Sequence, residues 1–284
     1  MTAGQGPDFL IIGAMKSGTT TLQAQLAAQA GIFMTTPKEP NYFSDDDVFA
    51  KGTGWYQTLF DAAAPGDIKG EASTHYTKLP TYPQTVTRLA DMVSAPKLIY
   101  VIRDPVARAV SHYIHEWSEG RMGDDPVAAF ADHPELVAYS QYPMQLAPFI
   151  ARFGLDAILL TSLEELTRDP DGVLSRIGPH IGSTTPLIWD HGLGAQNVSS
   201  ERFRRLPLHR LLVANPVARA LRRNLVPAGL RAKIRKARTH GDRPELPQSL
   251  RRELEQRFAP DRAALAALFP DHPALSLAYG FVPQ

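Results

Sequence analysis

Residues 9–21 read FLIIGAMKSGTTT, a short apolar run followed by a loop with a lysine, a second glycine and three threonines. The apolar run ends in Gly13 and predicts a strand buried on both faces, as strands of parallel sheets are. The threonines after Gly18 predict a helix over residues 20–30, with a glycine directly after it. A strand, a glycine loop and a helix start point several backbone N–H groups at one place, which suits a phosphate or sulfate group.

The rest of the chain alternates strand-like and helix-like segments. The other segments that predict strands are residues 32–34, 68–72, 97–102 and 157–161. Asp104-Pro105 offers an N-cap residue and a proline in the first helical position, and predicts a helix that reaches Trp117. This alternation predicts an α/β fold, a P-loop-like parallel sheet flanked by helices.

The organisation expected is one domain over residues 1–284 with helical insertions. Its α/β core spans residues 8–200, and a basic helical segment follows over residues 202–240. Residues 119–134 are polar and have no clear periodicity, so we expect a surface excursion there.

The glycine loop departs from the phosphate loop of ATP-binding proteins. That loop has a lysine directly after the second glycine of its motif. Here Thr19 takes that place after Gly18, and Lys16 stands two positions before the glycine. A lysine at the front of the loop does not favour a grip on the β- and γ-phosphates of ATP. The plain alternative is a strand, turn and helix that bind no ligand.

Two segments resemble the motifs of sulfotransferases that use 3′-phosphoadenosine-5′-phosphosulfate (PAPS). Residues 16–21 are similar to that family's loop for the 5′-phosphosulfate, which implies PAPS contacts from Lys16, Ser17, Gly18, Thr19, Thr20 and Thr21. Residues 97–113, KLIYVIRDPVARAVSHY, are similar to the family's 3′-phosphate element, which implies Arg103 and Ser111 as its ligands. The position of Arg103 supports this, because α/β sheets bind ligands at the carboxyl ends of their strands and guanidinium grips phosphate well.

Three shorter blocks narrow the resemblance to the heparan sulfate N- and 3-O-sulfotransferase branch, in its bacterial form. They are KEPNYF at 38–43, KGTGWY at 51–56 and GEASTHY at 70–76. With these blocks the resemblance covers residues 8–200 and implies an enzyme with PAPS as its donor. The sequence departs from the branch at Asn41, where a histidine is common, and at Ala72, where a lysine is expected. Both departures concern the binding site of the sulfuryl acceptor and the residues that take up its proton, and not the PAPS site.

Sulfuryl transfer needs charge stabilisation, an acceptor in line with the leaving oxygen, and a base for the acceptor proton. We expect Lys16 to neutralise the leaving phosphate. Two residues compete as the base: Glu39 matches the catalytic glutamate of the branch, and His75 has a Thr-His context like that of cytosolic sulfotransferases. Glu39 is the first choice, and a nearby sulfate donor is expected to raise its pKa. The plain alternatives are an ion pair of Glu39 with Lys38 and a structural histidine.

A late loop and a basic window follow the core. Residues 196–204 resemble the loop that covers the nucleotide in bacterial members, which implies Asn197, Ser199 and Arg202 near the 3′-phosphate or adenine. Residues 202–238 contain ten Arg and two Lys and no Asp or Glu, so of the net charge of +1 the rest of the chain carries 1 − 12 = −11. This window either faces an acidic acceptor or lipid surface, or is a solvated pair of helices. Nucleic acid is not expected as a partner, since only one aromatic residue interrupts the basic ones.

Several classes are disfavoured. The sequence has no Cys, and His112 and His115 lack a third ligand, so we expect no metal site. No apolar run approaches the roughly 18 residues of a membrane span, and no secretory signal pattern appears, so a cytoplasmic location is expected. The acceptor is left open as a small molecule, glycan or lipid with a hydroxyl or amine. The alternative functions are a P-loop nucleotide kinase, which needs a lysine directly after Gly18, and a non-catalytic nucleotide-binding module.

Overall fold

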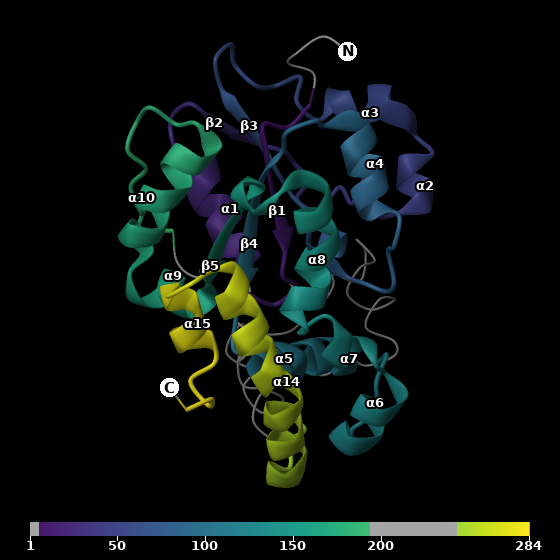
Figure 1. The fold of residues 1–284 in the computed structure, drawn as a ribbon. Coiled ribbons are helices and arrows are strands. Elements are labelled where there is room, and N and C mark those ends of the chain that lie inside the picture. Colours follow the sequence, from purple (N-terminus) through teal and green to yellow (C-terminus); the bar gives the residue numbers. More distant parts are fainter. Residues whose placement is uncertain (1–5, 194–242, 284) are drawn as a thin grey trace, which may run out of the picture.

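The computed structural model describes residues 6–193 and 243–283 (Figure 1). Five strands form one parallel sheet in the order β2-β3-β1-β4-β5. They are β1 (Phe9–Gly13), β2 (Ile32–Met34), β3 (Ile68–Ala72), β4 (Lys97–Ile102) and β5 (Ile158–Ser162). The predicted parallel α/β sheet is confirmed, and only β5 is displaced, by one residue. Because β1 is central, the loops after β3, β1 and β4 lie next to one another.

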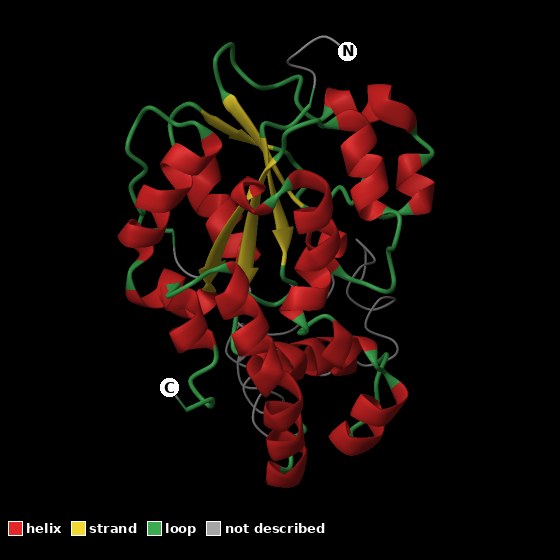
Figure 2. Ribbon diagram, viewed as in Figure 1, coloured by secondary structure: helices red, strands yellow, loops and turns green. Residues whose placement is uncertain are grey.

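Helices surround the sheet, as Figure 2 shows. The α-helices are α1 (Thr19–Ala27), α2 (Asp46–Phe49), α3 (Gly52–Thr58), α4 (Thr85–Met92), α5 (Pro105–Ser118), α6 (Pro126–Asp132), α7 (Glu135–Ala138), α8 (Tyr142–Phe153), α9 (Leu163–Arg168), α10 (Pro170–Ile181), α14 (Gln248–Leu268) and α15 (Pro273–Ala278). Two 3-10 turns, η1 (Thr74–Thr77) and η2 (Leu155–Ala157), follow β3 and precede β5.

Alternation along the strands divides the core into two layers. Successive side chains of a strand point to opposite faces, and every residue of β1 is buried. Phe9 and Ile11 join the cluster that packs against α1, α9 and α10. Leu10 and Ile12 join the larger cluster, which includes residues of α4, α5, α8 and α14. A strand that is apolar at every position therefore has both faces covered, as predicted (Figure 1).

The observed ends of two helices near the site, α5 and α1, can be compared with the predicted ends. Asp104 caps α5, since its Oδ1 accepts a hydrogen bond from the Ala107 N–H at 2.9 Å, and the helix extends one residue past the predicted end. The prediction for α1 was wrong at its carboxyl end, because the helix stops at Ala27 and not at residue 30. There the Gln29 N–H bonds to the Leu26 carbonyl at 3.1 Å, a tighter turn that leads into β2.

Two further segments differ from expectation. The polar stretch 119–134 is not only a surface excursion, because it contains α6, which buries Phe130. Asp125 caps that helix by accepting from the Val127 N–H at 2.8 Å. The long helix α14 had no counterpart in the sequence predictions, although its buried Leu250, Leu254 and Phe258 have helical spacing. The predicted basic helical segment, residues 202–240, lies outside the described residues.

Candidate active site

The lysine loop joins the end of β1 to the start of α1 at the carboxyl edge of the sheet. The Ala14 N–H bonds to the Val101 carbonyl at 2.8 Å, which fixes the loop against β4. Gly18 occupies the N-cap position of α1 with φ 87°, a left-handed conformation that favours glycine. No side chain in the described part of the chain caps this helix start. A helix start with glycine in the N-cap position suits a ligand such as phosphate.

Ser17 supplies a second sign of a ligand in this loop. Its side chain is fully buried, and its Oγ has no hydrogen-bond partner among the described residues. Buried hydroxyl groups are nearly always hydrogen-bonded in folded proteins. A phosphate or sulfate oxygen in the loop would give this hydroxyl an acceptor, so the residues present fit the phosphosulfate end of PAPS.

Gly13, at the end of β1, has no room for a side chain. Its φ is 155°, and a Cβ would lie 2.0 Å from Thr77 Oγ1 and 2.9 Å from Tyr100 Cε2. Thr77 Oγ1 is held in place because it donates to the Ile12 carbonyl at 2.7 Å. We expect Gly13→Ala to lower the free energy of unfolding by about 3 kcal/mol, measured by urea denaturation. The control is Gly54→Ala, whose Cβ meets nothing within 4 Å; equal stability of the two variants would contradict this packing.

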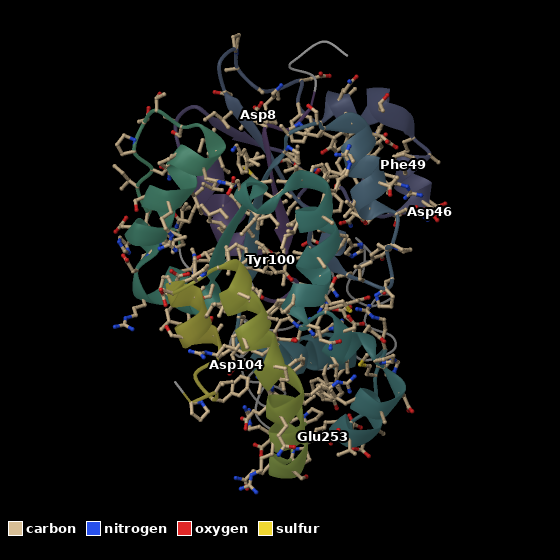
Figure 3. The ribbon with its side chains drawn as sticks, in the orientation of Figure 1. Asp8, Asp46, Phe49, Tyr100, Asp104 and Glu253 are labelled. Carbon is tan, nitrogen blue, oxygen red and sulfur yellow. The ribbon has the colours of Figure 1, made fainter. Side chains whose placement is uncertain are left out.

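Arg103 connects the end of β4 to the lysine loop. Its Nη1 donates to the Lys16 carbonyl oxygen at 3.2 Å. Its own backbone is fixed by the buried Tyr142 hydroxyl, which donates to the Arg103 carbonyl at 2.8 Å and accepts from the Arg103 N–H at 3.3 Å. Figure 3 shows the side chains around Tyr100 of β4 and Asp104, which directly follows Arg103. The structure thus brings together two predicted phosphate ligands that lie 87 residues apart in sequence.

Helix α5 carries the other predicted 3′-phosphate ligand. Ser111 is buried on this helix, two turns after Arg103. Arg108 lies on the same helix. Its guanidinium is fully buried and donates to the Leu136 carbonyl at 2.5 Å and to the Ser140 hydroxyl. Arg108 therefore ties α5 to α7 and to the loop after it, through one main-chain carbonyl and one side-chain hydroxyl.

Glu39 lies on the other side of β1, next to the end of β3. Its N–H donates to the Ala72 carbonyl at 2.9 Å. Its Oε1 accepts from Lys38 Nζ at 2.5 Å and its Oε2 from the Thr74 hydroxyl at 3.2 Å. Burial raises the pKa of Glu39, but the hydrogen bond and charge of Lys38 and the charge of Lys78 outweigh it, and the pKa falls below its ordinary value. The expected rise of this pKa is not seen in the protein alone, because cations from two segments surround the carboxylate.

His75, the rival base, is half-buried in η1. Its ring stacks on Tyr82 with centroids 4.9 Å apart, and its buried Nδ1 has no partner among the described residues. Burial and the charge of Lys78 lower the pKa of His75 to about 4. The imidazole is thus neutral near pH 7, and it lies close to the Glu39 carboxylate.

Comparison with known proteins identifies the family of this chain. The family model described as the sulfotransferase domain matches residues 6–200. The chain belongs to the sulfotransferase family. It is similar to heparan sulfate glucosamine 3-O-sulfotransferase 3B1 of Mus musculus, with 30% identity over 187 residues that cover 63% of this chain and 46% of the relative. It is also similar to the bifunctional heparan sulfate N-deacetylase/N-sulfotransferase 4 of Mus musculus, with 25% identity over 211 residues, 66% of this chain and 23% of the relative.

A solved structure shows the same fold. A sulfotransferase from Alicyclobacillus acidocaldarius has a TM-score of 0.67 at 24% identity, covering 95% of this chain and 98% of that one. The chain spans about half the length, or less, of the curated relatives it matches. No three His, Asp or Glu side chains of residues 6–193 and 243–283 gather as metal ligands. No helix within those ranges is long and apolar enough to cross a membrane.

The predicted site residues of this sulfotransferase fall into two groups. Lys16 and Arg103 are in contact, and Glu39 and His75 lie together on the β3 side. The threonines at the start of α1 and Ser111 occupy the neighbouring elements, as their motifs implied. Asn197, Ser199 and Arg202 lie outside the described residues.

Sequence reasoning missed a buried network behind Glu39. The carboxylate of Glu71 accepts hydrogen bonds from the hydroxyls of Ser73, Tyr56 and Tyr76. Its signal was present in the block at 70–76, where a charged residue stands one position before the end of β3. A charged residue near a strand's end was not enough to predict that three hydroxyl groups would converge on it.

Proposed function

We propose that this sulfotransferase moves the sulfuryl group of PAPS to a hydroxyl or amine of an acceptor and releases adenosine 3′,5′-bisphosphate (PAP). The observation that carries the proposal is the bond between Arg103 Nη1 and the Lys16 carbonyl, at 3.2 Å. It places a guanidinium beside a loop suited to the 5′-phosphosulfate. A second phosphate ligand there matches PAPS, which carries a 3′-phosphate, better than ATP, which does not. The matching family model supports the same reading.

The residues that bind the two phosphate ends of PAPS and the proposed base follow, or lie beside, three neighbouring strands. The loop after β1 binds the phosphosulfate with N–H groups, threonine hydroxyls and Lys16. Arg103, after β4, and Ser111 bind the 3′-phosphate. Glu39, beside β3, is on the opposite side of the loop from Arg103. This order suits in-line transfer, which places the acceptor oxygen and the leaving oxygen on opposite sides of sulfur.

In the transfer, PAPS supplies the sulfuryl group. A bond forms between the acceptor oxygen or nitrogen and sulfur while the bond from sulfur to the 5′-phosphate oxygen breaks. Glu39 takes the acceptor proton, and the Lys16 ammonium neutralises the charge that develops on the departing phosphate. The lowered pKa of Glu39 keeps its carboxylate ionised near pH 7 and able to accept a proton. His75 is the alternative base.

The acceptor class to test first is a glycan hydroxyl. Two relatives are named for heparan sulfate glucosamine 3-O-sulfation and heparan sulfate N-sulfation. Small-molecule and lipid hydroxyls are the other arms of the test, because one fold carries many acceptors. We propose that the basic window at 202–238 contacts an acidic part of the acceptor or an acidic surface, on the strength of its ten Arg and two Lys.

Nucleotide binding provides the experiment. Calorimetric titration is expected to show PAP binding about 30-fold more tightly than adenosine 5′-phosphate, the scale of about 2 kcal/mol for a hydrogen bond to a charged group. ATP should bind more weakly than PAP. Arg103→Ala should remove most of the PAP advantage. The matched control is Arg152→Ala, an exposed residue of α8 near the start of β5, at the opposite edge of the sheet.

Equal affinity for PAP and adenosine 5′-phosphate would contradict the assignment of Arg103. Tighter binding of ATP than of PAP would favour a nucleotide kinase.

A further inference from the structure

The turn that carries Glu39 has an unusual backbone. Glu39 and Asn41 have φ values of 59° and 57°, in the left-handed region that residues other than glycine seldom adopt. Pro40 stands between them, and its ring restricts the turn further. Such conformations persist only where the surrounding structure holds them, and they gather at functional sites. The contacts that keep the 39–41 turn in this conformation therefore bear on its function.

Two hydrogen bonds attach this turn to the end of β3. The Glu39 N–H donates to the Ala72 carbonyl at 2.9 Å. The Asn41 N–H donates to the hydroxyl oxygen of Ser73 at 3.0 Å. Since Ser73 is fully buried, water does not compete for this bond. The turn is thus attached to the sheet at both ends.

The Ser73 hydroxyl is oriented by a buried carboxylate. It donates its single hydrogen to Glu71 Oε1 at 2.5 Å, so its lone pairs are left to accept from Asn41. Glu71 is itself fully buried, and its Oε2 accepts from the hydroxyls of Tyr76, at 3.0 Å, and Tyr56. Three hydroxyl donors thus converge on this carboxylate. Burial raises the pKa of Glu71, and these hydrogen bonds oppose that rise.

We propose that Glu71 and Ser73 are positioning residues of the transfer reaction, which hold the 39–41 turn so that the Glu39 carboxylate faces the acceptor. The inference rests on the proposed role of Glu39 as base. Separate contacts, from Lys38 and Thr74, hold the Glu39 side chain, so the network acts through the backbone. A buried carboxylate costs free energy unless it is well paired, and an apolar residue would fill the same space at less cost. Its place directly behind the turn fits a positioning role.

The test compares Ser73→Ala and Glu71→Gln with the wild-type protein in three measurements. These are hydrogen exchange of the Asn41 amide, PAP affinity, and PAP release from PAPS with heparan sulfate or with water alone as acceptor. We expect exchange at Asn41 to accelerate at least tenfold and kcat to fall at least tenfold. PAP affinity and the KM for PAPS should change less than twofold. The control is Glu165→Gln, a buried carboxylate in the capping box of α9, which should lose stability without altering exchange at Asn41 or kcat.

The outcomes separate the inference from the proposed function. A wild-type protein that releases no PAP with any of the glycan, small-molecule and lipid acceptors overturns the function and, with it, the positioning role. An active wild type with Ser73→Ala equally active overturns the inference alone, as does continued protection of the Asn41 amide in that variant. If Ser73→Ala does not fold, Ser73→Cys takes its place, because a thiol of similar size is a weak hydrogen-bond acceptor.

Discussion

Glu39→Gln is expected to lower the turnover of PAPS at least about 100-fold, the scale of a lost general base. Glutamine keeps the shape and can still accept from Thr74, but it cannot take a proton at neutral pH. PAP affinity should stay within about twofold, since Glu39 lies on the β3 side and the nucleotide ligand Arg103 on the β4 side. Turnover is measured as PAP release with saturating donor, and affinity by calorimetry.

His75→Ala is the matched comparison for Glu39→Gln. The imidazole is neutral above about pH 4, so its own protonation does not limit turnover near pH 7. Loss of its stacking on Tyr82 should have a smaller effect than loss of the Glu39 carboxylate. The reverse result, an inactive His75→Ala beside a nearly wild-type Glu39→Gln, would make the histidine the base.

Lys16→Ala should lower kcat about 100- to 1000-fold, the cost of removing one group that stabilises transition-state charge. The loss of PAP affinity should be much smaller, because leaving-group charge develops mainly in the transition state. Lys16 has φ 71°, and alanine meets the same backbone strain, so the variant removes the ammonium without a new backbone cost. Lys97→Ala, an exposed residue at the start of β4, is the control.

Equal losses in binding and turnover would contradict this account of Lys16. They would make it an anchor for the bound nucleotide and leave the departing phosphate without a named partner.

Strand positions were predictable because the apolar runs are short and end in clear turn residues. Residues 9–13 and 97–102 fold as predicted, and Asp104-Pro105 begins α5. These signals are local, since a buried strand or a helix cap is encoded within a few residues. The lysine loop and Arg103 could be matched from their motifs, and the contact between them follows from adjacent parallel strands.

The surroundings of Glu39 were not predictable in the same way. The direction of its pKa depends on Lys78 as well as on Lys38, and Lys78 comes from another segment. The hydrogen bond from the Asn41 N–H to the Ser73 hydroxyl oxygen joins residues that lie 32 positions apart in sequence. Neither contact has a local signature, so only the folded chain shows them.

The most direct measurement is the transfer of a ³⁵S-labelled sulfuryl group from PAPS to an acceptor. The wild-type protein is incubated with labelled PAPS and, in separate arms, heparan sulfate, small hydroxyl compounds and a lipid hydroxyl. The account predicts that in at least one arm PAP and labelled acceptor form in equal amounts, and that ATP is not consumed. Tight PAP binding with no label transferred in any arm would contradict it and favour a non-catalytic nucleotide-binding module. Transfer of the γ-phosphate of ATP instead would identify a kinase.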